Sequence, residues 1–389
     1  MLFETIVAFV VILALLVLVH EAGHFFTARL FGVRADEFGF GFPPRAFGVQ
    51  KRKNGKWKFL GAKGEGDADG GTVYSINWLP LGGFVKIKGE GGEARSDHDS
   101  FAARPIWQRG IILAAGVTMN VVLAFVLLVG AFIIGIPQST DDIPSSKEIV
   151  VRNAQIQILE VEKDFPAAAS LKAGDVLVAV DGKPIQTISN FQTYINTHRD
   201  GLTLQYRRGS DLQETVLKPK VLDEEDRAVI GVNLSEVATV SYPWYQAIPR
   251  GFVATYTIIG TILGGYWDFF SNVFSGQKIA AEVSGPVGIA VYTSMVVKLG
   301  FIYILQFTIV LSLNLAILNF LPIPALDGGR FLFLMIEKFR RRPVVERIEN
   351  MTHTIGFALL MVLVVVLTYR DLARWGGDIL RVLKRSTGL

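Results

Sequence analysis

The 389-residue chain contains no cysteine. A disulfide framework is therefore excluded, and so is any metal site that uses thiolate ligands. Histidine is also scarce, with five residues in the whole chain. Any metal would have to be held by histidine and carboxylate groups, a ligand set that suits zinc and also other divalent ions.

Charged residues make up only 19% of the chain, whereas 50% of the residues are hydrophobic. This composition is typical of membrane proteins. The formal net charge of +4 is small, and no basic stripe is interleaved with aromatic residues, so a nucleic-acid partner is not expected.

The residues before the first apolar run, Ile6–Val19, include Glu4 but neither lysine nor arginine, which is unlike a secretory signal peptide. Residues 3–27 are long enough to cross a bilayer, and we expect them to remain as a membrane helix.

A polar motif, His20-Glu21-Ala22-Gly23-His24, follows that apolar run directly. On a helix, residues four positions apart lie about 40° apart around the axis, so His20 and His24 can bind one metal ion with Glu21 beside it. Zinc hydrolases use this spacing, with two imidazoles as ligands and a glutamate that activates water. The alternative is a chance match. Polar groups are costly in a membrane helix, which favours the metal site.

The polar, glycine-rich residues 31–105 predict a small β region. Phe38–Phe42 and Trp57–Phe59 alternate with the period of a strand, and Leu81–Lys88 follow as an apolar hairpin tip with a free edge. Two interpretations are open. The hairpin is either part of an ordinary sheet or an edge that receives an extended peptide by strand addition.

A second apolar segment, Gly110–Ile136, predicts a second membrane helix with Asn120 near its middle. Asn120 would either form a hydrogen bond between helices or face an active site. The polar residues 137–245 then read as a helix, a turn, a strand and an Asp-Gly turn between 167 and 185, followed by a helix over 188–196 and strands over 202–207 and 214–217. This order resembles a bacterial PDZ domain, an α+β fold that binds peptides beside a helix.

A third membrane helix is expected over Phe301–Leu321, and it is followed by two prolines that break it. Asp327 lies just after this break, where it is either a helix cap or a metal ligand. Ile355–Tyr369 predict a fourth span, after the basic residues 338–347. Residues 252–267 are apolar but short and contain Gly264-Gly265, so we expect a helix that lies in the membrane interface.

Together the motifs resemble the site-2 protease family of intramembrane zinc metalloproteases, in its bacterial regulator-of-sigma-E type. The family pattern N-x-x-P-x-P-x-L-D-G is met in full by Asn319–Gly328, and G-x-x-x-N is met by Gly116 and Asn120. The HExxH motif, the hairpin and the PDZ module occur in the family's order. The best-studied members carry two tandem PDZ units, whereas this chain has room for one.

That resemblance implies that His20, His24 and Asp327 bind Zn2+ and that Glu21 is the general base. It implies active-site support from Asn319 and Asn120, and a hairpin that holds the substrate strand through Gly83, Phe84, Val85 and Lys86. The expected partners are membrane-embedded protein substrates, such as anti-sigma factors or remnant signal peptides, together with the bilayer and a peptide ligand of the PDZ module.

Basic residues favour the cytoplasmic side of a membrane. The loops 28–105 and 330–347 are rich in lysine and arginine, which predicts an extracytoplasmic N-terminus and PDZ domain and an active site toward the cytoplasm of a bacterial inner membrane. Four spans then bring all three expected ligands to one side, whereas a fifth at 252–267 would separate them. The basic tail, which four spans leave outside, disagrees with this rule.

The predicted protein is therefore a polytopic α-helical membrane protein with four transmembrane helices, a membrane-associated β-hairpin and an extracytoplasmic PDZ domain. Two other classes compete with a protease. A non-catalytic adaptor would not need Glu21, and a transporter would show inverted repeats, which the four unlike spans do not. The expected divisions are 1–30 (first span), 31–105 (β region), 106–136 (second span), 137–245 (PDZ), 246–299 (interfacial helices), 300–329 (third span and ligand segment), 330–349 (basic loop), 350–370 (fourth span) and 371–389 (basic amphipathic tail).

Overall fold

A computed structural model of the chain describes residues 2–67, 69–140, 148–209, 211–222, 227–276 and 284–387. The chain forms two compact units. The first contains Met1–Leu128, Phe252–Val297 and Tyr303–Leu389, and the second contains Val129–Gly251 with Lys298–Ile302. Each unit is described by itself.

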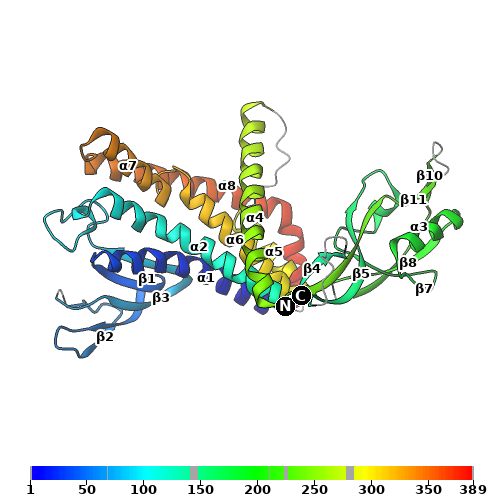
Figure 1. Cartoon of the computed structure of the whole chain (residues 1–389), viewed down its shortest axis with the longest axis horizontal. Helices are drawn as coiled ribbons and strands as arrows, with labels where there is room; N and C mark the ends of the chain where they lie inside the picture. Colours follow the sequence, from blue (N-terminus) through cyan, green and yellow to red (C-terminus); the bar gives the residue numbers. More distant parts are fainter. Residues whose placement is uncertain are drawn as a thin grey trace. The chain divides into compact units, whose positions relative to one another are not determined.

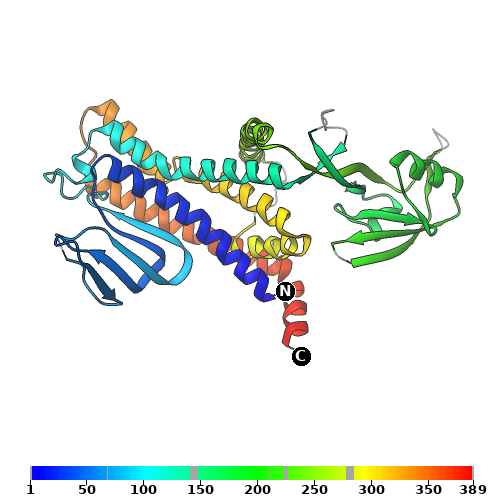
Figure 2. The same cartoon turned by 60° about the horizontal axis from the view of Figure 1, so that its bottom comes forward.

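Long apolar helices make up most of the first unit (Figures 1 and 2). Within the described residues, five helices are long and apolar enough to cross a membrane. Each helix pairs its backbone N–H and C=O groups internally, and its mostly apolar side chains suit a lipid environment. The five are α1 (Leu2–Leu30), α2 (Ile106–Ile134), α4 (Trp244–Phe274), α6 (Phe301–Phe320) and α8 (Glu346–Thr387). Two shorter helices, α5 (Pro286–Leu299) and α7 (Asp327–Arg340), complete the set.

Two of these helices differ from what we expected. The region around Gly264-Gly265 is not interrupted, because α4 continues for 31 residues. A glycine inside a helix costs only about 1 kcal/mol relative to alanine, so two glycines do not end a helix of this length. The fourth predicted span and the tail also form one helix, since α8 runs for 42 residues from Glu346.

A small antiparallel sheet lies beside α1 in the first unit (Figures 1 and 2). It contains β1 (Ala35–Lys51), β2 (Trp57–Gly61) and β3 (Val73–Ile87), in the order β2-β1-β3. Both arms of β3 pair with the first part of β1. Among the described residues, the second arm, Gly83–Ile87, pairs with no other strand, so the predicted free edge is confirmed.

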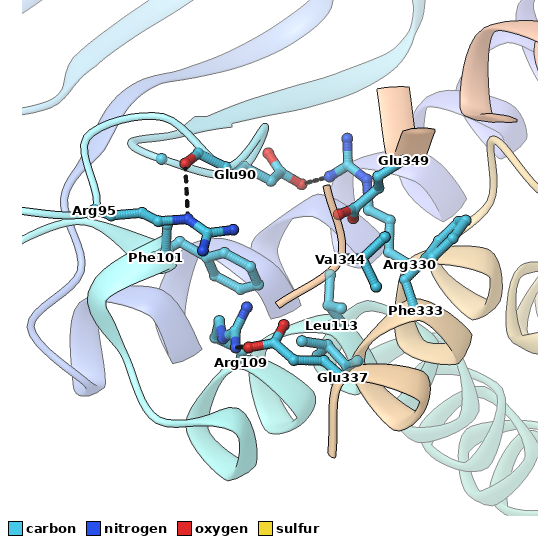
Figure 3. Close-up of a pocket in the computed structure, with 14 residues that line it drawn as sticks. Glu90, Arg95, Phe101, Arg109, Leu113, Arg330, Phe333, Glu337, Val344 and Glu349 are labelled. Atoms are coloured by element: carbon cyan, nitrogen blue, oxygen red, sulfur yellow. Dashed lines mark hydrogen bonds and ion pairs between the residues drawn. The ribbon is translucent and has the colours of Figure 1, made fainter. Parts of the chain in front are cut away.

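The end of α1, the sheet, α2 and α7 share one hydrophobic core. Its buried members are Ala28, Val33, Ile87, Phe101, Ile112, Leu113 and Leu334. Two ion pairs lie beside this core (Figure 3). Arg109 on α2 bonds Glu337 on α7 at 2.6 Å, and Arg330 on α7 pairs with Glu90, which follows β3. The packing therefore fixes α7 against the sheet and α2.

The second unit is a mixed α+β structure. A seven-stranded sheet in the order β4-β12-β5-β6-β8-β9, with β7 beside β6, is accompanied by one helix and a two-stranded ladder. Its strands are β4 (Ile136–Ser139), β5 (Val150–Val161), β6 (Val176–Val180), β7 (Lys183–Pro184), β8 (Leu202–Arg208), β9 (Asp211–Leu217), β10 (Lys220–Leu222), β11 (Arg227–Val229) and β12 (Val232–Ser241), and its helix is α3 (Ile188–Thr197).

Local sequence signals located the elements of this unit well. The helix expected over 188–196 is α3, and Thr187 caps it by accepting a hydrogen bond from the Asn190 N–H. The Asp-Gly turn is confirmed as well, because Asp181 and Gly182 both have positive φ, at 46° and 74°, between β6 and β7. The expected helix near 167 is only a short 3-10 turn, Pro166–Ala169.

Candidate metal centre

Two imidazoles of α1 contact each other in a buried part of the first unit. His20 and His24 are 5% and 6% exposed, and their Nε2 atoms lie 3.2 Å apart. The helical rise over four residues places the second ring one turn above the first, as the motif predicted.

Asp327 reaches the same point from the other end of the sequence. Helix α6 ends at Phe320, the chain turns through Pro322 and Pro324, and α7 begins at Asp327 itself. Its Oδ2 lies 2.9 Å from His20 Nε2 and 3.2 Å from His24 Nε2.

The glycines that follow Asp327 make the tight turn between α6 and α7 possible. A Cβ at Gly328 would collide with the carbonyl oxygens of Phe320 and Leu321, at the end of α6. A Cβ at Gly329 would lie 2.5 Å from the Ile323 carbonyl oxygen. The Asp-Gly-Gly sequence thus lets the first turn of α7 pack directly on the segment that precedes it.

These three atoms form a set that a divalent cation fits. Within the described residues, His20, His24 and Asp327 are the one group of three such ligands whose atoms all lie within 4.8 Å of one another. Ligands of a tetrahedral zinc ion at bond lengths of 2.0–2.1 Å are about 3.3 Å apart, close to the 2.9–3.2 Å observed. Asp327 Oδ2 is buried without a conventional hydrogen-bond donor, and a bound cation would compensate it.

A neighbouring carbonyl sets the protonation of His24. Its Nδ1 lies 2.8 Å from the Ile112 carbonyl oxygen. Because a carbonyl can only accept, Nδ1 carries the proton and donates it, which leaves the Nε2 lone pair free for a metal.

Two asparagines lie against His20. The Asn120 amide nitrogen is 3.4 Å from its Nδ1, and the Asn319 amide nitrogen is 3.4 Å from its Nε2. Asn120 Oδ1 is buried without a partner. A half-turn of that amide would let Oδ1 accept the His20 Nδ1 proton and free Nε2. Both predicted support residues therefore lie at the site.

Glycines bring α1 and α2 close enough for these contacts. A Cβ at Gly116 would overlap His24 Nε2 and would lie 2.8 Å from His20 Cε1. A Cβ at Gly23 would lie 2.7 Å from the Ala115 carbonyl carbon. The G-x-x-x-N motif thus provides space for the rings with its glycine and a polar contact with its asparagine.

The edge arm of the sheet meets Glu21. The Val85 N–H donates a hydrogen bond to Glu21 Oε2 at 3.1 Å. The approach is close because Gly82 and Gly83 pack on α1, where added Cβ atoms would meet Val17 at 2.9 Å and Leu18 at 3.3 Å.

The other two hairpin residues of the prediction, Phe84 and Lys86, belong to the same arm, and Lys86 is exposed. At the end of this arm, Lys88 donates to Asp97 and Asp99, and these bonds raise its pKa. Its ion pairs fix the chain where it leaves the sheet.

The sequence reasoning missed one residue. His353 on α8 accepts a hydrogen bond from the Ala325 N–H at 2.8 Å, two residues before Asp327. The available signal was a histidine at the start of an apolar segment, in a chain with only five.

Comparison with known proteins agrees with this arrangement. Residues 8–62 and 60–363 match peptidase family M50. The zinc metalloprotease RasP of Geobacillus kaustophilus is 30% identical, over 96% of this chain and 98% of the relative. The regulator of sigma-W protease RasP of Bacillus subtilis is 27% identical, over 95% and 99%.

Among solved structures, the PDZ domain of an SdrC-like protein from Listeria innocua is 28% identical, with a TM-score of 0.20, and the match covers 21% of this chain and 92% of that domain. The family match extends over most of the chain and includes both the HExxH helix and the Asp327 segment. The chain belongs to peptidase family M50.

Proposed function

We propose that this protein is an intramembrane zinc metalloprotease that cleaves peptide bonds within or near transmembrane segments of its substrates. One observation carries the proposal: His20, His24 and Asp327 converge on one point. The two histidines and Glu21 lie on α1, a helix suited to a membrane. The names of the relatives support the same chemistry.

His20 Nε2, His24 Nε2 and Asp327 Oδ2 would hold the zinc ion. Three protein ligands leave a position open, as in catalytic sites. When bound there, zinc supplies Lewis acidity that activates water and polarises a peptide carbonyl.

Glu21 is the general base. Its carboxylate takes a proton from the attacking water and delivers it to the leaving amine nitrogen. Asn319, whose amide nitrogen lies near His20, is suited to donate to the substrate carbonyl oxygen as negative charge develops on it. Asn120 holds His20 in the required tautomer and orientation.

The edge arm Gly83–Ile87 would bind the substrate as an added strand. A transmembrane helix hides its carbonyls in its own hydrogen bonds, so it must unwind before it can be cleaved. An extended peptide gains new partners at a free sheet edge. The backbone N–H of Val85 points to Glu21 on α1. A strand bound at this edge would therefore have its scissile bond near the base.

We infer four membrane crossings, by α1, α2, α6 and α8, with α4 in the interface. Figures 1 and 2 support this inference, because the part of α4 in the first unit runs across the direction of α1 and α2. The apolar window of α4 is also the least hydropathic of the five. With this parity, the N-terminus and the second unit are extracytoplasmic, and the site opens toward the cytoplasm of a bacterial inner membrane.

The second unit would act as a PDZ module that binds a peptide or controls access to the site. Its groove lies between α3 and β11, and it is lined by Phe165, Phe191, Ile195, Ala228, Ile230 and Val232 among others. The substrate class that the family resemblance implies is membrane-anchored regulators, such as anti-sigma factors, or remnant signal peptides. The name of the Bacillus subtilis relative, regulator of sigma-W protease, agrees with a regulatory substrate.

A Glu21→Gln substitution tests the proposal. Purified wild type and variant are incubated with single-span bacterial membrane proteins, and zinc is measured in parallel. The variant should keep its zinc and its fold but lose cleavage by about 100-fold or more. Glu160→Gln, at an exposed carboxylate of the second unit, is the matched control and should cleave normally. Normal turnover by the Glu21 variant would refute the mechanism.

The same experiment separates the alternative, a non-catalytic adaptor that binds peptides through its PDZ module. An adaptor would contain zinc in a structural site and show no cleavage in the wild type. The carboxylate of Glu21 beside the proposed ligands argues against it, because a structural site has no use for a base.

A further inference from the structure

The position of Asp327 depends on the preceding segment, residues 322–326, whose backbone has few hydrogen-bond donors. Pro322 and Pro324 lack N–H donors. Between them and Asp327, Ala325 adopts a φ of +80°, a left-handed conformation that is unfavourable for residues with a Cβ. Such a conformation persists only where neighbouring structure imposes it.

The neighbour that imposes it is α8. The Ala325 N–H donates to His353 Nδ1 at 2.8 Å. One turn further along α8, Gly356 packs on Pro324, the residue before Ala325. A Cβ at Gly356 would lie 2.6 Å from the Pro324 carbonyl oxygen and 2.7 Å from its carbonyl carbon. A donor and a close backbone contact therefore hold two consecutive residues of the segment.

The same face of α8 continues toward α7. Glu349, His353 and Gly356 have the spacing i, i+4, i+7, which places them along one side of a helix. Glu349 lines the pocket that also contains Arg330, one turn after Asp327 (Figure 3). The His353 ring lies 5.6 Å from the Phe333 ring of α7. The face thus borders the segment on both sides of Asp327.

We propose that this face of α8 positions the metal ligand Asp327 and that His353 is its central positioning residue. The inference rests on the proposed function in that Asp327 is taken to bind zinc. His353 acts as the acceptor for Ala325, so its imidazole proton is on Nε2. Removing this acceptor leaves the partly buried Ala325 N–H without a partner and releases the φ of Ala325.

The test compares two substitutions of similar shape. His353→Asn keeps an acceptor near the position of Nδ1, whereas His353→Leu fills the space without one. Zinc affinity of the full-length protein in lipid nanodiscs is measured by competition with a chromogenic chelator. Outer-shell partners of metal ligands are typically worth about 10- to 100-fold in affinity. We expect His353→Leu to weaken zinc binding by about 10-fold or more, and His353→Asn to restore most of it.

A second pair of variants tests the backbone contact. Gly356→Ala should weaken zinc binding, although alanine is the better helix former. Gly376→Ala, in the same helix with nothing within 4 Å of an added Cβ, is the control and should bind zinc like the wild type. If His353→Leu does not accumulate, the comparison of Gly356→Ala with Gly376→Ala still tests whether α8 positions Asp327.

The outcomes separate the two proposals. A wild-type protein that binds no zinc would remove the proposed function. A wild type that binds zinc, with His353→Leu and Gly356→Ala binding it equally well, would remove only the positioning role. Equal losses in His353→Leu and His353→Asn would also contradict it, because rescue by the acceptor is its central expectation.

Discussion

The closeness of Gly116 to both imidazoles allows a sharp prediction for a Gly116→Ala substitution. The new Cβ would lie 2.8 Å from His20 Cε1 and Nε2, and it would overlap His24 Nε2. Nonbonded carbon atoms prefer about 3.5 Å or more, so the His20 ring must move by roughly 0.7 Å. Zinc sites tolerate deviations of only about 0.2 Å in ligand distance.

We therefore expect Gly116→Ala to reduce zinc affinity by at least about 10-fold, the lower limit seen for disturbed ligand shells. Proteolysis should fall in parallel. The helix itself should not suffer, since alanine favours helix by about 1 kcal/mol over glycine.

The assay pairs metal content with helicity by circular dichroism. Gly130→Ala, in the same helix α2 but with nothing within 4 Å of its added Cβ, is the matched control and should bind zinc normally. Wild-type zinc affinity and activity in Gly116→Ala would show that the rings do not sit as described, and the reasoning from this geometry would be refuted.

Three further predictions concern the ligands and the sheet edge. Asp327→Asn should lower zinc content in elemental analysis while the second unit keeps its fold, and unchanged zinc would remove Asp327 from the ligand set. Val85→Pro should slow cleavage with zinc retained, because it removes the N–H that faces Glu21, whereas Val85→Ala keeps that N–H and should cleave normally; equal rates would argue against the edge as a substrate site. Chelation should abolish cleavage and zinc should restore it, and activity that survives complete metal removal would exclude a metalloprotease.

Much of the candidate site was predictable because its residues lie in motifs with short, fixed intervals along the sequence. The four-residue interval of His20 and His24 defines a shared helix face whatever the tertiary fold. The two prolines before Asp327 lack N–H donors, so a break of the helix was expected there. The resemblance to a known family then paired these two segments, which no local rule could do across about three hundred residues.

The expected interruption of α4 at Gly264-Gly265 was wrong for an energetic reason. Gly264 and Gly265 were taken as an interruption, yet the helix continues through them. Two glycines weaken a helix by a small amount that the other 29 residues of α4 can outweigh. The orientation of α4 depends on packing, such as the hydrogen bond from the Tyr266 hydroxyl to Asn314 on α6 at 3.0 Å, and packing partners cannot be read from composition.

The role of His353 was hidden for a deeper reason. Its partner is a backbone N–H, not a side chain, so no pairing of residue types signals it. Ala325 has no sequence signature of a positive φ, because glycine or asparagine would be the usual choice there. In our proposal, α8 holds the strained alanine in place with a hydrogen bond and a glycine contact. The proposed positioning of Asp327 therefore depends on how the helices assemble. A substitution that spares Asp327 while removing the His353 acceptor tests it.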